Sequence, residues 1–280
     1  MSKILIKDKD FPVSASIPFL KWVGGKRWLV ANHLELFPQN IDRYIEPFLG
    51  SGAVYFALGR KDSILSDANE DLIEAYKAVR DCWENVEKHL KKHAKHHCSD
   101  YYYTVRESRP VTAATRAARF IYLNRTCFNG IYRVNKQGSF NVPKGSRNNV
   151  MLETDDFAQL SAQLKDVKLI ASDFEPIITD TKSGDFMFVD PPYTVAHNLN
   201  GFLKYNEVIF TWADQIRLRD CLLEAGNRGV RFLLTNADHQ SIWDLYHKGF
   251  NIRRVERRSS VAGSSRNRKA VTELLIEANF

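Results

Sequence analysis

Short apolar runs alternate along this chain with longer stretches in which apolar residues recur every three or four positions. The short runs predict strands near residues 44–46, 63–66, 167–171, 186–189 and 230–235, followed by two more near 252–256 and 271–277. The longer stretches predict helices at residues 27–37, 69–81, 83–97, 212–226 and 240–247. Strands and helices that alternate in this order are typical of an α/β fold.

The apolar run 186–189 is followed at once by Asp190-Pro191-Pro192-Tyr193. Two prolines end the strand ladder, because proline has no N–H to donate. A carboxylate, a stiff turn and an aromatic ring therefore stand at the carboxyl end of a strand, where open α/β sheets bind ligands. The Asp190 carboxylate and the Pro191 carbonyl can each accept an N–H from a nucleobase amine, and Tyr193 can stack on the base. This set suits methyl transfer to an amino nitrogen, although an isolated tetrapeptide of this kind can also be a plain turn.

Two glycine-rich turns precede predicted helices in the first part of the chain. Gly24-Gly25 lies between Trp22 and Lys26, and paired glycines let the main chain approach a ligand closely. The turn at residues 50–52 follows a strand as G-x-G, without the third glycine of the full dinucleotide-binding pattern. Asp67 ends the next strand at the interval where an acidic residue meets ribose hydroxyls in such folds. Each turn alone is a weak signal, and the first could be an ordinary loop.

Basic and aromatic residues are interleaved between residues 100 and 150, with a hairpin signal at 136–138. This mixture indicates a lobe that grips nucleic acid, although tyrosine-rich segments can also be core. From this lobe we predict DNA contacts by Arg106, Arg125 and Arg147. A second basic segment, 257–269, predicts phosphate contacts by Arg266 and Arg268, with a solubilising loop as the alternative.

Composition narrows the class of protein further. The 280 residues carry a formal charge of +7 and are 44% hydrophobic, typical of a globular protein with a polyanionic partner. No apolar run of membrane-spanning length and no signal-peptide pattern occur, and the four cysteines are scattered, so we expect a cytoplasmic protein with reduced thiols. His93 and His97 share a helical face, but the lysines around them indicate a solvated basic helix, and we predict no metal site.

Six segments in fixed order extend these interpretations: F-L-K-W-V-G-G-K, E-P-F-L-G-S-G-A, S-D-A-N, L-N-R-T-C-F-N-G-I-Y-R-V-N, F-N-V-P and D-P-P-Y. Over about residues 19–275 the chain resembles the Dam-type DNA adenine-N6 methyltransferases (D12 class, alpha group). The resemblance implies a Rossmann-like seven-stranded methyltransferase sheet with an inserted, mostly helical DNA-recognition lobe that contains a β-hairpin. It implies a catalytic domain at 1–82 and 150–280 and a DNA-recognition domain at 83–149.

The resemblance also implies a reaction and its partners. S-adenosylmethionine would donate the methyl group, leaving S-adenosylhomocysteine, and double-stranded DNA would be the substrate. The target adenine would be flipped out of the duplex in GATC or a GAT-containing site. We expect a monomer with no membrane association.

Carried over by position, the resemblance assigns catalysis to Asp190, Pro191 and Tyr193. It assigns cofactor contacts to Trp22, Lys26, Glu46, Pro47, Phe48, Gly50, Gly52, Asp67, Asp173, Phe174 and Asp190. In relatives that recognise GATC, base-contacting positions match Lys21, Ile131, Arg133 and Pro143. A pair that enters the duplex near the displaced adenine matches Phe128 and Asn129.

Other classes of protein account for less of the sequence. A non-catalytic DNA-binding protein leaves Trp22, Asp67 and Asp190 unexplained, and a nucleotide-fold oxidoreductase would need the third glycine. A methyltransferase acting on RNA or on cytosine N4 remains an alternative. The segment 194–205 and the Gly145-Ser146-Arg147 stretch differ from the best-known members, so the exact recognition sequence stays open.

Overall fold

The computed structural model describes residues 16–22, 24–135, 137–196, 210–258 and 270–278. The chain forms two compact units. Unit 1 comprises Met1–Asn32, Gly50–Lys61 and Asn69–Leu169, and unit 2 comprises His33–Leu49, Asp62–Ala68 and Ile170–Phe280. The predicted recognition segment 83–149 falls within unit 1, and the division into functional domains stays a prediction.

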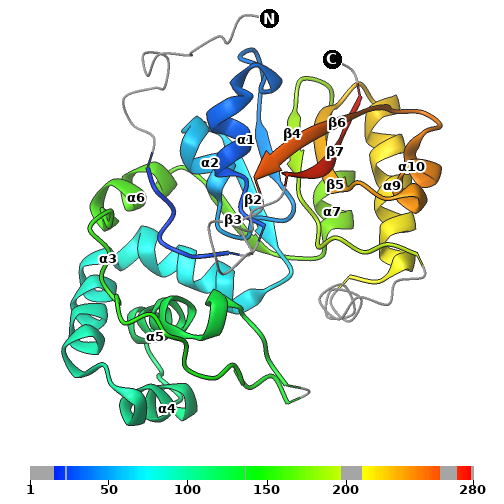
Figure 1. Ribbon diagram of the computed structural model, residues 1–280. Coiled ribbons are helices and arrows are strands. Elements are labelled where there is room, and N and C mark those ends of the chain that lie inside the picture. Colours follow the sequence, from blue (N-terminus) through cyan, green and yellow to red (C-terminus); the bar gives the residue numbers. More distant parts are fainter. Residues whose placement is uncertain (1–15, 23, 136, 197–209, 259–269, 279–280) are drawn as a thin grey trace, which may run out of the picture. The chain divides into compact units, whose positions relative to one another are not determined.

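A seven-stranded sheet with the order β3-β2-β1-β4-β5-β7-β6 confirms the predicted α/β fold (Figure 1). Its strands are β1 (Tyr44–Glu46), β2 (Ser63–Asp67), β3 (Lys168–Ala171), β4 (Phe186–Val189), β5 (Arg231–Ala237), β6 (Asn251–Arg258) and β7 (Ala270–Ala278). β1 pairs in parallel with β2 and β4, and β4 with β5. β7 is antiparallel to both β5 and β6. The parallel strands therefore end at one edge, where their following loops carry the predicted site residues.

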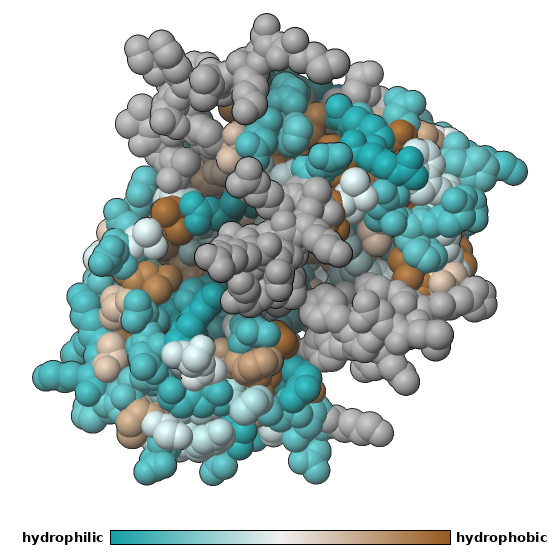
Figure 2. Space-filling view, in the orientation of Figure 1, coloured by the Kyte–Doolittle hydropathy of each residue, from teal (hydrophilic) through white to brown (hydrophobic). Residues whose placement is uncertain are grey.

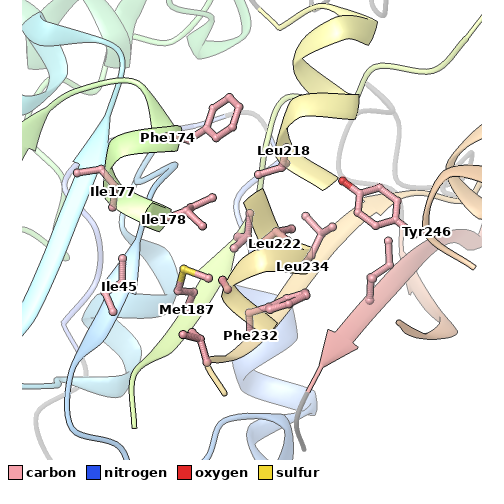
Figure 3. Packing of buried hydrophobic residues seen from close by; sticks show 14 of the residues in the cluster. Ile45, Phe174, Ile177, Ile178, Met187, Leu218, Leu222, Phe232, Leu234 and Tyr246 are labelled. Atoms are coloured by element: carbon pink, nitrogen blue, oxygen red, sulfur yellow. The ribbon is translucent and has the colours of Figure 1, made fainter. Parts of the chain in front are cut away.

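In unit 2 an apolar cluster joins the sheet to α7 (Phe174–Thr179), α9 (Trp212–Asn227) and α10 (Gln240–Tyr246). Figure 3 shows side chains of Ile45, Met187 and Phe232 close to those of Ile178 and Leu222. Each fully buried side chain of this size contributes about 1.5–3 kcal/mol through removal from water. α9 begins where predicted because Thr211 and Asp214 form a capping box at its first turn. This packing holds the strand ends in place.

Unit 1 is mostly helical. Its helices are α1 (Arg27–Asn32), α2 (Ala53–Leu58), α3 (Glu70–His96), α4 (Ser99–Glu107), α5 (Ala113–Thr126) and α6 (Phe157–Leu164), with short 3-10 helices at Phe128–Gly130 and, in unit 2, at Leu34–Leu36. α3 replaces the two helices predicted at 69–81 and 83–97, and non-helical Cys82 (φ −153°, ψ 45°) marks the predicted break. α5 packs along α3 (Figure 1). The helix predicted at 27–37 is shorter and gives way to the 3-10 turn.

The hairpin expected around residues 136–138 has no regular strands among its described residues. Isolated bridges join Val134 to Phe140 and Cys127 to Lys144. The main-chain N–H of Asn135 donates to Ser139 and that of Asn141 donates to Arg133. This segment is therefore a hairpin-like turn closed by single bridges, which corrects the expected β-hairpin.

The described surface is largely hydrophilic in the view of Figure 2, with hydrophobic residues in small scattered groups. Within the described residues, no helix combines the length and the apolar character needed to cross a lipid bilayer.

Candidate active site

The predicted catalytic carboxylate lies where β4 ends. All four residues of β4 are buried, and Val189 is paired with Leu234 of β5. Asp190 follows Val189 at the end of β4, and Thr235 follows Leu234 on β5. The Thr235 hydroxyl donates to Asp190 Oδ1 at 2.6 Å, while Asp190 itself is partly exposed. The carboxylate is thus held at the sheet edge with its rotation restrained.

Tyr193 is held by a carboxylate on the neighbouring part of the sheet. Its hydroxyl donates to Oε2 of Glu273 at 3.0 Å, and Glu273 on β7 is only 3% exposed. Burial raises the pKa of Tyr193 well above its usual value, and the nearby charges of Asp190 and Glu273 raise it further. The phenol therefore stays protonated and acts as the donor in this contact.

The chain after the tetrapeptide is also fixed. Thr194 is fully buried, and its hydroxyl donates to the Phe210 carbonyl at 2.6 Å. The buried amide of Gln215 on α9 donates to the Thr194 carbonyl at 3.3 Å. Most of the segment 194–205, which differs from the best-known members of the resembled family, lies outside the described residues.

Main-chain hydrogen bonds bring the ends of β1, β2 and β3 together in unit 2. The N–H of Leu49 donates to Ser66, and that of Ser172 donates to Asp67. Glu46 at the end of β1 is buried, and the Tyr44 hydroxyl donates to it. The predicted cofactor residues Glu46, Pro47, Phe48 and Asp67 therefore lie at neighbouring strand ends.

Asp173 and Phe174 begin α7 beside an arginine that the sequence did not single out. Arg217 donates from Nη1 and Nη2 to both oxygens of Asp173, at 2.7 and 2.9 Å. Burial would raise the pKa of Asp173, but hydrogen bonds from Arg217 and from the main chain of Glu175 outweigh it and lower the pKa. Phe174 is 4% exposed, stacks on Phe48 with centroids 5.4 Å apart, and lies 4.2 Å from the Arg217 guanidinium carbon. Its ring supports the site mainly by packing.

In unit 1 the two glycine-rich turns contact each other. Gly50 has φ +48°, and a Cβ on it would lie 2.8 Å from Cδ1 of Trp22, so glycine is required on both counts. The Tyr76 hydroxyl donates to the Gly50 carbonyl at 3.2 Å. Lys26 is buried, and its Nζ donates to the Gly24 carbonyl at 2.7 Å. Gly52, with φ +61°, precedes α2. The structure thus brings Trp22, Lys26 and the 50–52 turn close together in unit 1.

Arg125 does not suit the DNA contact predicted for it. Its side chain is 0% exposed and pairs with Asp155, with both nitrogen–oxygen distances at 2.6 Å. Its remaining donors bind the Phe19 and Val150 carbonyls. A guanidinium used in this way cannot reach a phosphate, so that prediction was wrong and Arg125 is a structural residue.

The segment that carries Lys21 is tied to α5 by a neighbouring amide. Asn124, fully buried, accepts from the Lys21 N–H at 2.9 Å and donates to the Lys21 carbonyl at 2.7 Å. It also donates to the Gly130 carbonyl at 3.3 Å. Burial lowers the pKa of the Lys21 amine, and repulsion by Arg147 lowers it further. Lys21 and the Phe128–Gly130 turn are therefore brought to one place in unit 1.

Several other predicted DNA contacts lie at the surface of unit 1. Phe128 is 53% exposed, and Asn129 next to it has φ +56°. The exposed Arg133 donates from Nε to Asn141 at 2.8 Å. Pro143 and Arg147 are exposed, whereas Ile131 and Arg106 are partly buried. Arg266 and Arg268 lie outside the described residues.

His93 of α3 and His97, which follows the helix, each contact a tyrosine hydroxyl. His93 Nδ1 lies 2.9 Å from the Tyr101 hydroxyl, and His97 Nδ1 lies 2.8 Å from the Tyr122 hydroxyl. Burial lowers the pKa of His93 to about 4, helped by His89 and Lys92. In the described part of the chain, no three His, Cys, Asp or Glu side chains are grouped so as to hold a metal ion.

Sequence reasoning missed three residues that support the site: Thr235, Glu273 and Arg217. A signal existed for Glu273, because an acidic residue inside the apolar run of β7 has to find a partner. Thr235 resembles any threonine of a buried strand, and Arg217 resembles any arginine of a helix.

The strand order and the polar strand ends are those of a methyltransferase-type α/β enzyme. The sequence model of the D12 class N6 adenine-specific DNA methyltransferases matches residues 22–261. The chain belongs to this family and is an adenine-specific DNA methyltransferase. Members of the family use S-adenosylmethionine as methyl donor.

Individual relatives cover nearly the whole chain. The Type II methyltransferase M1.LlaDCHI of Lactococcus lactis subsp. cremoris is 33% identical over 92% of this chain and 94% of its own. The Type II methyltransferase M.MjaIII of Methanocaldococcus jannaschii is 35% identical over 92% and 98%. A DNA adenine methylase of Haemophilus influenzae is 29% identical over 92% of each chain.

Proposed function

We propose that this methyltransferase flips adenine out of double-stranded DNA and methylates N6 with Asp190, Pro191 and Tyr193 as its catalytic groups. The observation that carries the proposal lies at the end of β4. The Asp190 carboxylate is held there by Thr235, and the Tyr193 hydroxyl is bound to the buried Glu273. Two oxygen acceptors fixed at a turn can turn an amino group toward an incoming methyl group.

The reaction needs alignment more than a strong base. Adenine N6 cannot reach a cofactor inside the duplex, and unstacking costs a few kcal/mol that stacking on Tyr193 offsets. S-adenosylmethionine supplies the methyl group as an alkyl sulfonium. Asp190 and the Pro191 carbonyl accept the two N–H groups, which favours a pyramidal nitrogen with an available lone pair. The proton leaves after transfer, because the methylated, positively charged amine is acidic.

The residues present fit the cofactor in each unit. In unit 2, Asp67 is a partly exposed carboxylate at a strand end and suits ribose hydroxyls, while Glu46 and Asp173 offer further acceptors. In unit 1, a Cβ at Gly50 would clash with the Trp22 indole. The main chain at residue 50 therefore carries no side chain where it lies beside the indole ring. We therefore keep Trp22, Lys26, Gly50 and Gly52 as proposed cofactor contacts.

For the DNA sequence we propose GATC or a site that contains GAT. The support is the match of Lys21, Ile131, Arg133 and Pro143 to base-contacting positions of relatives that recognise GATC. Exposure of Arg133 agrees with guanine recognition, since a bidentate arginine contributes about 1–3 kcal/mol of discrimination. Phe128 and Asn129 are exposed, as entry into a duplex requires. We further propose that Arg106, Arg147, Arg266 and Arg268 contact phosphates and that the enzyme acts as a cytoplasmic monomer.

The test replaces the carboxylate and reads methyl transfer. Asp190→Ala should keep the fold and DNA affinity and lose labelled-methyl transfer by about 10³-fold or more. Asp180→Ala removes a 77%-exposed carboxylate of the same unit and should leave the rate unchanged. Wild-type-like methylation by Asp190→Ala would refute the assignment. Base analysis of the methylated duplex separates adenine N6 from cytosine N4.

A further inference from the structure

The Thr235 hydroxyl of β5 and the Glu273 carboxylate of β7 lie on the same face of the sheet. Both are hydrogen-bonded to the tetrapeptide. Met187 of β4, Leu234 of β5 and Leu274 of β7 pack into the apolar cluster with α7, α9 and α10. Residues one position away face the opposite side, because side chains alternate along a strand. Thr235 and Glu273 are such residues.

We infer that Thr235 and Glu273 are positioning residues for methyl transfer: Thr235 aims the Asp190 carboxylate and Glu273 holds the Tyr193 ring. This inference rests on the proposed function, in which Asp190 and Tyr193 meet the flipped adenine. In the proposed mechanism, neither Thr235 nor Glu273 contacts the substrate. Both act through the residue to which they are hydrogen-bonded.

Thr235 acts on the direction of the carboxylate. Its hydroxyl is fully buried and donates to Oδ1 at 2.6 Å. A carboxylate turns about one bond, so fixing Oδ1 also sets the direction in which Oδ2 points. The bond favours the ionised form of Asp190, which is the form that accepts an N–H.

Glu273 acts on the aromatic ring. Burying a carboxylate to 3% exposure is costly, and an apolar residue would serve plain packing at this strand position better. The Tyr193 hydroxyl, which donates to it at 3.0 Å, is anchored at the far end of the ring. The ring plane is then set before the base arrives, which reduces the entropy lost on stacking.

The first experiment removes the Thr235 hydroxyl without changing the shape of the side chain. Thr235→Val should lower the single-turnover methylation rate about 10–100-fold and leave DNA and cofactor affinities within about twofold. Thr235→Ser, which keeps the donor, should recover most of the rate. Thr181→Val is the matched control, because Thr181 is 5% exposed, its hydroxyl donates to the Ile178 carbonyl, and it precedes β4 whereas the tetrapeptide follows that strand. It should lose stability and keep the rate.

A double-mutant cycle separates positioning from general stability. In an Asp190→Ala background, which removes the acceptor of the hydroxyl, Thr235→Val should have little further effect on the residual rate. A rate loss in Thr235→Val that matches Thr181→Val, or that Thr235→Ser fails to recover, would overturn the inference for Thr235.

The second experiment tests Glu273 through Tyr193. Glu273→Leu should lower the methylation rate about tenfold or more while the free energy of unfolding stays equal or rises, because a buried charge is replaced by an apolar group. Glu273→Gln, which keeps an acceptor, should lose less. In a Tyr193→Phe background both substitutions should have little additional effect. Full methylation activity of the Glu273→Leu variant would refute the positioning role of Glu273.

Failure of the inference and failure of the proposed function give different results. If Asp190→Ala loses activity while Thr235→Val and Glu273→Leu behave like the wild type, only the positioning roles are wrong. If Asp190→Ala itself methylates DNA normally, the proposed catalytic role is wrong.

Discussion

The candidate catalytic residues of unit 2 and the candidate DNA-contacting residues of unit 1 are held in different ways. In unit 2 the functional side chains themselves have buried partners, since Asp190 is bound by Thr235 and Tyr193 by Glu273. In unit 1 the buried Asn124 binds the main chain of Lys21 and of Gly130 instead, and Phe128 and Asn129, just before Gly130, are exposed.

The difference corresponds to two physical tasks. In-line methyl transfer loses rate when the reacting groups move by a fraction of an ångström, so restraint of each side chain is useful. Recognition of a duplex tolerates side chains that change rotamer on binding, provided that the main chain that carries them stays in place. Four predictions test this contrast, from the largest expected effect to the smallest.

The largest expected effect is the difference in free energy of unfolding between the Arg125→Ala and Arg133→Ala variants. Arg125→Ala leaves Asp155 buried without its partner, and the free energy of unfolding should fall by about 3–5 kcal/mol. Arg133→Ala removes an exposed side chain and should change it by about 0.5 kcal/mol or less. Urea denaturation of both variants measures this. A large loss for Arg133→Ala would remove the contrast between buried anchors and exposed contacts.

Acid should weaken the structure through His93. Its pKa is about 4 in the folded state against 6.5 when unperturbed, so between these values the unfolded chain binds more protons. The stability contributed by neutral His93 is present above pH 6.5 and is lost as pH falls toward 4, by up to about 3 kcal/mol. Denaturation at pH 7.5, 6 and 4.5 measures the slope. In His93→Gln the slope should flatten, and an unchanged slope would assign it to other groups.

Arg133→Ala should reduce discrimination between specific and random duplexes by about 1–3 kcal/mol. Competition binding with both duplexes gives this ratio. Arg147→Ala is the comparison variant, and we expect it to weaken binding to both duplexes alike, as loss of a phosphate contact does. Equal losses on both duplexes for Arg133→Ala would contradict base recognition by this residue.

The smallest effect is expected for Arg266 and Arg268. Replacing both with Gln should leave the specificity ratio unchanged and reduce the dependence of log binding constant on log salt by about 1.8, or about 0.9 for each lost phosphate contact. Binding measured between low and moderate salt gives the slope. A slope equal to the wild-type value would exclude phosphate contacts at these positions.

Local patterns were enough to predict the sheet and the position of the tetrapeptide. Prolines after an apolar run mark a strand end whatever the surroundings, and this fixed β4 correctly. The contact between Trp22 and Gly50 was not predicted, although it explains why a glycine stands there, since glycine tolerates both the positive φ and the close indole.

Roles set by distant partners could not be predicted in the same way. Arg125 lies among basic residues in sequence, and its burial depends on Asp155, which comes from a separate segment. Thr235 and Glu273 acquire meaning only when β7 enters the sheet beside β5. The turn at residues 135–139 has a different, local origin, since the Asn135 side chain accepts from the main-chain N–H groups of Gln137 and Ser139.

The place of β7 in the sheet has a consequence for synthesis of the enzyme. β7 is antiparallel between β5 and β6, yet it follows both in the chain, and it carries the acidic partner of Tyr193. A nascent polypeptide whose earlier strands have already left the ribosome would still lack that carboxylate. An incomplete chain that ends before residue 273 therefore cannot hold Tyr193 in this way.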